Sequence, residues 1–215
     1  MNPAQVCNLS QLLRQTAALH PDRLGVVQGE RQWTWGEIDA RVDAMVAALR
    51  SLGIRQGDRL LVQSRNTLAM FESCWVAFRL GAVWVPVNFR LTPPEVAVLG
   101  ASSGAAAMLV DDGFESHVQA VREAAPALRV IVPMGEGGAG GPGWESLIAA
   151  HRGAERFEAS VGADDPLWFF YTSGTTGRPK AGMLTHGQMA FIVTNHLADL
   201  IPGTTEHDVS IAVAP

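Results

Sequence analysis

The chain has 215 residues, of which 47% are hydrophobic and 17% charged, and its formal net charge is −5. This composition can bury a sizeable core in one or two domains, and the acidic balance argues against a nucleic-acid partner. No segment is long and apolar enough to cross a bilayer, and the N-terminus carries no secretory signal pattern. The two cysteines lie far apart without metal-ligand spacing, which fits a reducing compartment. We therefore expect a cytoplasmic protein without a transmembrane segment.

The first half of the chain contains several helix start signals. Asn8 or Ser10 can cap a helix that runs to about Leu19. The segments 34–37 and 92–95 each place a threonine three residues before a glutamate, and this spacing is typical of a capping box at a helix start. The residues from Thr67 to Leu80 read as a largely buried helix. Shorter helices are predicted for residues 114–125 and 144–150.

Short apolar segments alternate with these helices and predict strands. They are Leu24–Gln28 with a hairpin into residues 32–33, Arg59–Gln63, the middle of residues 81–91, Ala106–Val110, Val130–Pro133 and Leu167–Phe170. Strands that alternate with helices at this spacing favour βαβ units. The predicted fold class is therefore α/β, with a mainly parallel sheet and helices on both faces.

A glycine-rich segment at 135–140 formally matches a dinucleotide-binding fingerprint. In a true fingerprint the helix begins within the glycines, whereas here Gly141, Pro142 and Gly143 intervene before a helix can start near Trp144. We interpret the segment as a surface loop.

The segment from Tyr171 to Lys180 is the strongest functional signal in the sequence. It reads Tyr-Thr-Ser-Gly-Thr-Thr-Gly-Arg-Pro-Lys and lies between two apolar runs. Hydroxyl groups can donate hydrogen bonds to phosphate oxygens, glycines allow close approach of the backbone, and the lysine adds a positive charge. The composition therefore predicts a phosphate-binding loop after a buried strand. A Ser/Thr/Gly surface turn is the simpler alternative.

The loop is not a Walker A motif, because Pro179 precedes the lysine and Ala181 follows it. Its pattern, with Met183 to His186 after it, resembles the phosphate loop of the adenylate-forming enzymes, which include acyl-CoA synthetases, luciferases and peptide-synthetase adenylation domains. That family usually has glycine directly after the lysine, whereas here the order is Ala181-Gly182. Residues 87–90 resemble the acid–CoA ligases more than the amino-acid-activating members, which favours a fatty or other organic acid as substrate.

The resemblance implies the site and its chemistry. The predicted phosphate contacts are Thr172, Ser173, Gly174, Thr175, Thr176, Gly177 and Lys180. Lys180 would support catalysis, and Thr176 is the candidate Mg²⁺ ligand. The co-substrates would be ATP with Mg²⁺, a carboxylic acid and coenzyme A, although the sequence leaves open whether the acceptor thiol belongs to coenzyme A or a carrier protein.

The resemblance also implies that this chain is the N-terminal part of a larger enzyme. Residues 1–163 would form a helix–strand subdomain and residues 164–215 the phosphate-loop strand, loop and following helix, with the C-terminal domain absent. We expect such a chain to be inactive alone. The competing hypothesis is a stand-alone phosphate- or nucleotide-binding module without catalysis, and a folded remnant with an empty loop is a third alternative.

Three expectations concern the end of the chain. His186 has no visible base partner, so we expect it to hydrogen-bond at a helix start rather than to act in catalysis. Residues 188–200 predict an amphipathic helix with Met189, Ile192, Val193 and Leu197 facing inward. Residues 209–214 are expected to begin another strand.

Overall fold

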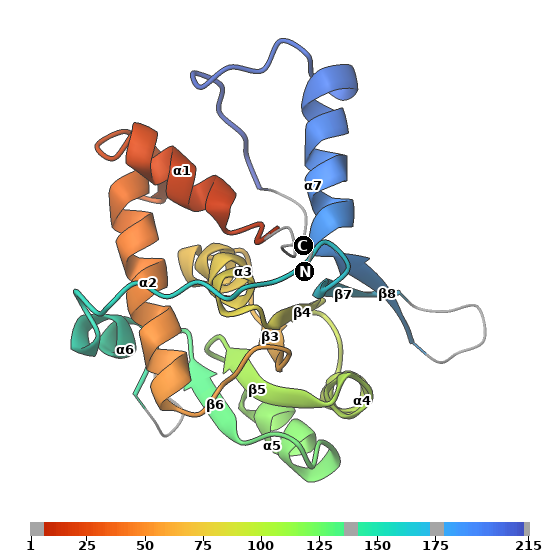
Figure 1. The fold of residues 1–215 in the computed structure, drawn as a ribbon. Coiled ribbons are helices and arrows are strands. Elements are labelled where there is room, and N and C mark those ends of the chain that lie inside the picture. Colours follow the sequence, from red (N-terminus) through yellow and green to blue (C-terminus); the bar gives the residue numbers. More distant parts are fainter. Residues whose placement is uncertain (1–6, 136–141, 173–178, 213–215) are drawn as a thin grey trace.

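The computed structural model describes residues 7–135, 142–172 and 179–212. Helices and strands alternate along the chain, as Figure 1 shows. In chain order they are α1 (Gln11–Leu19), β1 (Leu24–Gln28), β2 (Arg31–Thr34), α2 (Trp35–Ser51), β3 (Arg59–Gln63), α3 (Leu68–Leu80), β4 (Val83–Val87), α4 (Pro93–Ser103), β5 (Ala105–Val110), α5 (Glu115–Ala124), β6 (Val130–Pro133), α6 (Trp144–Ala150), β7 (Pro166–Thr172), β8 (Lys180–Thr185), α7 (His186–Asn195) and a π-helical turn η1 (His196–Leu200).

The central sheet has the strand order β6-β5-β3-β4-β7-β8 within the described residues. The pairs β6–β5, β5–β3, β3–β4 and β4–β7 are parallel, and β8 closes one edge antiparallel to β7. The strands β1 and β2 form a separate antiparallel hairpin. The prediction of a mainly parallel α/β sheet is therefore confirmed.

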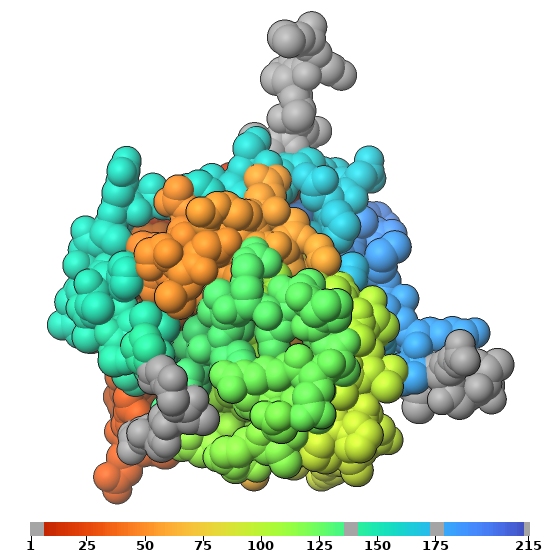
Figure 2. Space-filling model, turned by 90° about the horizontal axis from the view of Figure 1, so that it is seen from below, coloured from red at the N-terminus to blue at the C-terminus, as the bar shows by residue number. Residues whose placement is uncertain are grey.

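Helices cover both faces of the sheet. One apolar cluster joins β3, β5 and β6 to α1, α2, α3 and α6, and a second joins the opposite face to α4 and α5. Figure 2 shows α4 (yellow-green) and α5 (green) side by side on that second face. Because β3 and β5 are buried on both sides, they read as nearly continuous apolar runs.

Both predicted capping boxes are present. The Thr34 N–H donates to the Glu37 carboxylate at 2.8 Å, and the Glu37 N–H donates to the Thr34 hydroxyl at 3.2 Å. At α4, the Thr92 N–H and hydroxyl both donate to Glu95 at 2.7 Å, and these bonds lower the pKa of the Glu95 carboxyl. Each box satisfies backbone groups that a helix start would leave unpaired.

Two predictions near the end of the chain are wrong for some of their residues. Ile192 and Leu197 are 47% and 48% exposed, so they do not face a core. The helical segment itself runs to Leu200 as predicted, with α7 ending at Asn195 and the π-helical turn η1 continuing it to Leu200. No strand is formed in residues 209–212, where the Val209 side chain is 89% exposed. Met189, by contrast, packs against the core as predicted, so the apolar pattern alone did not distinguish the packed positions from the exposed ones.

Within residues 7–135, 142–172 and 179–212, none of the helices has both the length and the apolar character needed to span a bilayer. Most of the glycine-rich segment 135–140 lies outside the described residues.

Candidate functional site

The candidate phosphate loop joins β7 to β8 at the carboxyl-end edge of the parallel strands. Thr172 ends β7, Lys180 begins β8, and the two residues are direct partners in the antiparallel ladder. The other predicted phosphate contacts (Ser173, Gly174, Thr175, Thr176 and Gly177) lie outside the described residues. The strand pairing therefore brings the first and last predicted contacts together at the two ends of the loop. In open α/β sheets, ligands bind beyond this edge.

Strand alternation sets the face on which these side chains lie. Direct cross-strand partners share a face, and residues two apart along a strand share it too. Thr172 and Lys180 thus lie on the face of Trp168 and Phe170, whose rings are 5.9 Å apart. Tyr171 points to the other face, where its hydroxyl lies 2.9 Å from the Ser102 hydroxyl of α4.

The Lys180 side chain is exposed, and it forms no ion pair with any residue of the described ranges. The Thr172 side chain is also exposed. An unpaired ammonium group next to a hydroxyl can approach an anion without first breaking an internal salt bridge. The neighbouring Phe170 is 52% exposed, so the predicted buried strand is buried fully only at Leu167.

The base of the β7–β8 hairpin is held by hydrogen bonds to the segment before it. The N–H of His186 donates to the carbonyl of Asp165 at 3.1 Å, and the N–H of Gly187 donates to the carbonyl of Ala163 at 2.8 Å. Thr185 caps α7 in a capping box with Gln188. The base of the β7–β8 hairpin is therefore fixed.

The His186 imidazole is fully buried and accepts a hydrogen bond from the Leu9 N–H at Nδ1, 3.1 Å away. Burial lowers its pKa to about 4, so the ring is neutral near neutral pH. Its bond lies just before α1 rather than at the start of its own helix, whose capping group is Thr185. His186 therefore forms a hydrogen bond next to a helix start, as expected, but at the start of α1 rather than of its own helix α7.

Sequence reasoning missed one polar group at the same sheet edge. Gln63 ends β3 and is fully buried. Its amide nitrogen lies 3.5 Å from the carbonyl of Phe89, and its Oε1 has no partner among the described residues. The available signal was a glutamine that ends an otherwise apolar strand.

The described residues contain no cluster of three histidine, cysteine or acidic side chains that could hold a metal ion. The candidate Mg²⁺ ligand Thr176 lies outside these residues.

The sequence of this chain is similar to those of known CoA ligases. A feruloyl-CoA synthase from an Amycolatopsis species is 35% identical over 183 residues, which are 85% of this chain and 34% of that protein. A long-chain-fatty-acid–CoA ligase of Mycobacterium tuberculosis is 31% identical over 83% of this chain and 35% of its own length. This chain thus spans about a third of the length of these relatives.

The fold is shared with solved structures. The crystal structure of an anthranilate CoA ligase in complex with anthranoyl-AMP superposes with a TM-score of 0.83 at 23% identity, over 89% of this chain and 37% of that one. The model of the AMP-binding enzyme family matches residues 13–215. This chain therefore belongs to the AMP-binding enzymes, the adenylate-forming family that the phosphate-loop sequence indicated.

Proposed function

We propose that this chain supplies the phosphate-binding part of an enzyme that activates a carboxylic acid with ATP and transfers the acyl group to coenzyme A. The observation that carries the proposal is the position of Thr172 and Lys180 at the two ends of one loop, with the lysine exposed and without an ion pair in the described residues. The family match and the ligases among the relatives support it.

The reaction would proceed in two steps. The substrate carboxylate attacks the α-phosphorus of ATP, the bond to the β-phosphate oxygen breaks, and acyl-adenylate and pyrophosphate form. The coenzyme A thiol, losing its proton, then attacks the acyl carbon, and AMP leaves. Lys180 would offset negative charge on the leaving pyrophosphate, and the Thr172 hydroxyl would donate to a phosphate oxygen. Ser173, Gly174, Thr175, Thr176 and Gly177 remain predicted contacts, and Mg²⁺ would enter with ATP.

The substrate is proposed to be a fatty or other organic acid. Residues 87–90 favour this class, and the names of the two relatives refer to feruloyl and long-chain fatty acyl groups. Because the chain spans about a third of these relatives, we expect it to need further residues for acyl-CoA formation. A stand-alone binding module is the alternative, and it would bind Mg-ATP or pyrophosphate without supporting any turnover.

Lys180 is the only lysine in the sequence, which allows a direct test. An amine-selective acylating reagent can react only with Lys180 and with the α-amino group of Met1, and mass spectrometry measures both rates in one sample. We expect saturating pyrophosphate or Mg-ATP to slow acylation of Lys180 by about tenfold at ten times Kd, by mass action. The α-amino group, as the internal control, should react at an unchanged rate.

Equal rates with and without the phosphate ligand would contradict phosphate binding at Lys180. Protection by ATP with no ATP–pyrophosphate exchange by the full gene product, over a panel of fatty and aryl acids, would favour the binding module instead of the ligase.

A further inference from the structure

Two adjacent cavities lie at the amino-end edge of the sheet, opposite the candidate phosphate loop. The first has a volume of about 330 Å³ and is bordered by Arg59 and Val83, which begin β3 and β4. The second has a volume of about 500 Å³. Gln56 lines both, so the two cavities adjoin. Since Thr172 ends its strand at the other edge, neither cavity belongs to the proposed nucleotide site.

The second cavity combines an apolar floor with two arginines. It is lined by Arg50, Ile54, Arg55, Gln56, Leu80 and Phe157. Ile54 and Leu80 are buried, while Arg50, Arg55 and Gln56 are exposed. Figure 2 shows the end of α2 and the loop after it (orange) next to the connector that follows α6 (cyan-green). The cavity has the size of sites that hold small organic molecules.

Both arginines are held in place by groups other than carboxylates. The Arg50 guanidinium lies 3.8 Å from the centre of the Phe157 ring. One terminal nitrogen of Arg55 donates to the carbonyls of Arg50 and Ile54, at 2.8 and 2.9 Å. In the described ranges neither guanidinium forms a salt bridge. The nearby Asp58 carboxylate accepts from the Arg55 backbone N–H and pairs with Arg129.

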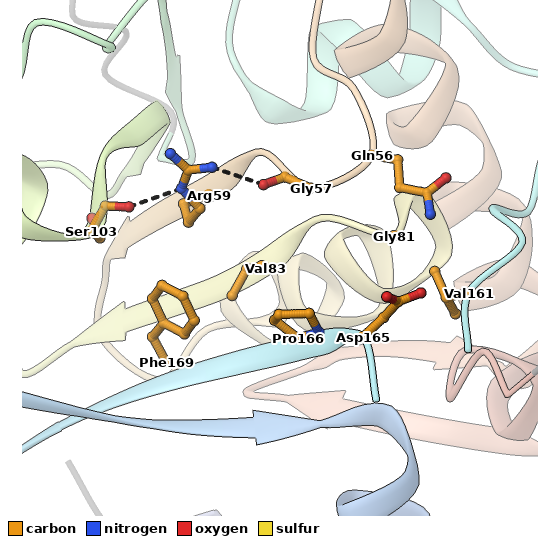
Figure 3. A pocket seen from close by; sticks show the side chains of 10 residues that line it. All are labelled: Gln56, Gly57, Arg59, Gly81, Val83, Ser103, Val161, Asp165, Pro166 and Phe169. Carbon is orange, nitrogen blue, oxygen red and sulfur yellow. Dashed lines mark hydrogen bonds between the residues drawn. The ribbon is translucent and has the colours of Figure 1, made fainter. Parts of the chain in front are cut away.

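The first cavity continues the apolar surface. Figure 3 shows Val83, Pro166 and Phe169 along its wall, with Arg59 at one end and Asp165 at the other. Arg59 donates to the carbonyls of Gly57, Ser103 and Gly104 and has no carboxylate partner among the described residues. An apolar group that passes Gln56 would therefore meet an apolar wall.

We propose that these cavities form a binding site for an organic anion with an apolar body. Arg50 and Arg55 would hold a carboxylate or phosphate head, because a guanidinium presents paired N–H donors that match both groups. The apolar body would lie over Ile54, Leu80 and Phe157 and extend past Gln56. This site is separate from the nucleotide site, and the inference does not depend on the proposed ligase activity.

The test is a titration of the ¹⁵N-labelled chain, followed by NMR, with three matched probes: octanoate, octyl phosphate and octanol. We expect saturable shifts of amides near residues 50–56 with at least one of the two anions, and binding of octanol weaker by about tenfold or more, since charge-assisted hydrogen bonds are lost. The two anions distinguish a carboxylate head from a phosphate head.

Replacement of both cavity arginines (Arg50→Gln and Arg55→Gln) should weaken binding of the preferred anion by about tenfold or more, because both charges are lost. Arg122→Gln, which removes an exposed arginine of α5, should leave it unchanged. Equal binding of octanol and the anions, shifts confined to other parts of the chain, or unchanged affinity in the double variant would overturn the proposal. Lys180→Ala should leave anion binding here intact, which separates this site from the nucleotide site.

Discussion

The backbone N–H of Leu9 donates to Nδ1 of His186 at 3.1 Å, although 177 positions separate the two residues. The ring also packs edge-on against Phe78 of α3, with ring centroids 6.3 Å apart. His186 begins α7 directly after the strand that carries Lys180. The start of the chain is thus tied to the base of the phosphate-loop hairpin.

This contact predicts a pH dependence of stability. The folded pKa of His186 is lowered from 6.5 to about 4 by burial, so the unfolded chain binds the proton more tightly. The contribution of His186 to the free energy of unfolding should therefore be fully present above pH 6.5 and be lost as the pH decreases from 6.5 to about 4. The total loss from this residue should be about 3 kcal/mol. Urea unfolding at several pH values measures the slope.

The comparison variant is His186→Phe, which cannot titrate. It should lack this part of the slope and lose about 1–3 kcal/mol at neutral pH, because the Leu9 N–H is left without its acceptor. His196→Gln, at an exposed position in η1, should keep the wild-type slope. Identical slopes in wild type and His186→Phe would show that His186 does not titrate in this window.

A second prediction concerns Arg79 of α3, which is fully buried. Its guanidinium donates to Asp39 at 2.5 Å and to Asp43 at 2.8 Å, both in α2. Arg79→Met should lower the free energy of unfolding by about 3–5 kcal/mol, because two largely buried carboxylates lose their fully buried partner and keep only the partly exposed Arg14. Arg122→Gln on the surface should change it by less than about 0.5 kcal/mol in the same urea experiment. If Arg79→Met lowered the free energy of unfolding by as little as Arg122→Gln, water would have to replace the guanidinium between the two carboxylates.

Local signals explain why much of the fold could be predicted. Thr34 with Glu37, and Thr92 with Glu95, satisfy backbone groups within one turn, so their effect does not depend on the rest of the chain. Apolar runs that alternate with helices likewise indicate strands buried between two helix layers. The loop composition predicts phosphate binding from the same kind of local signal, and this stays a prediction because Ser173 to Gly177 lie outside the described residues.

The remaining features depend on partners that are distant in sequence. Whether Ile192 faces a core or solvent depends on which element packs on α7, and an apolar pattern does not contain that information. The His186–Leu9 bond and the arginine-lined cavities arise from segments that meet only in the folded chain. Sequence periodicity cannot predict contacts between segments that are distant in the chain.

Cys74 should react slowly with thiol reagents. Burial raises its pKa to about 12, and its sulfur donates to the carbonyl of Phe71 at 3.0 Å. Because the thiolate is the reactive form, we expect alkylation near pH 8 to be slower than that of an unperturbed cysteine by about a hundredfold or more. Mass spectrometry of the Cys7→Ser variant isolates this rate. Fast alkylation of the folded variant would contradict the raised pKa of the thiol.

The last prediction separates ligand binding from folding at Lys180. Its side chain is exposed and has no ion pair in the described part of the chain, so Lys180→Ala should change the free energy of unfolding by less than about 0.5 kcal/mol. Loss of a charge-assisted hydrogen bond to phosphate should cost about 1.5–3 kcal/mol, or roughly tenfold or more in pyrophosphate affinity. Calorimetric titration measures the affinity, and urea unfolding measures the stability.

Lys180→Arg is the matched control, because it keeps the charge and should retain most of the affinity. If Lys180→Ala and Lys180→Arg lose pyrophosphate affinity equally, the shape of the lysine side chain, rather than its charge, determines binding. Unchanged affinity in Lys180→Ala would remove Lys180 from the phosphate site. A loss of affinity that accompanies a loss of stability would instead assign the residue to the hairpin itself, since a ligand contact on an exposed and unpaired side chain has no reason to affect folding.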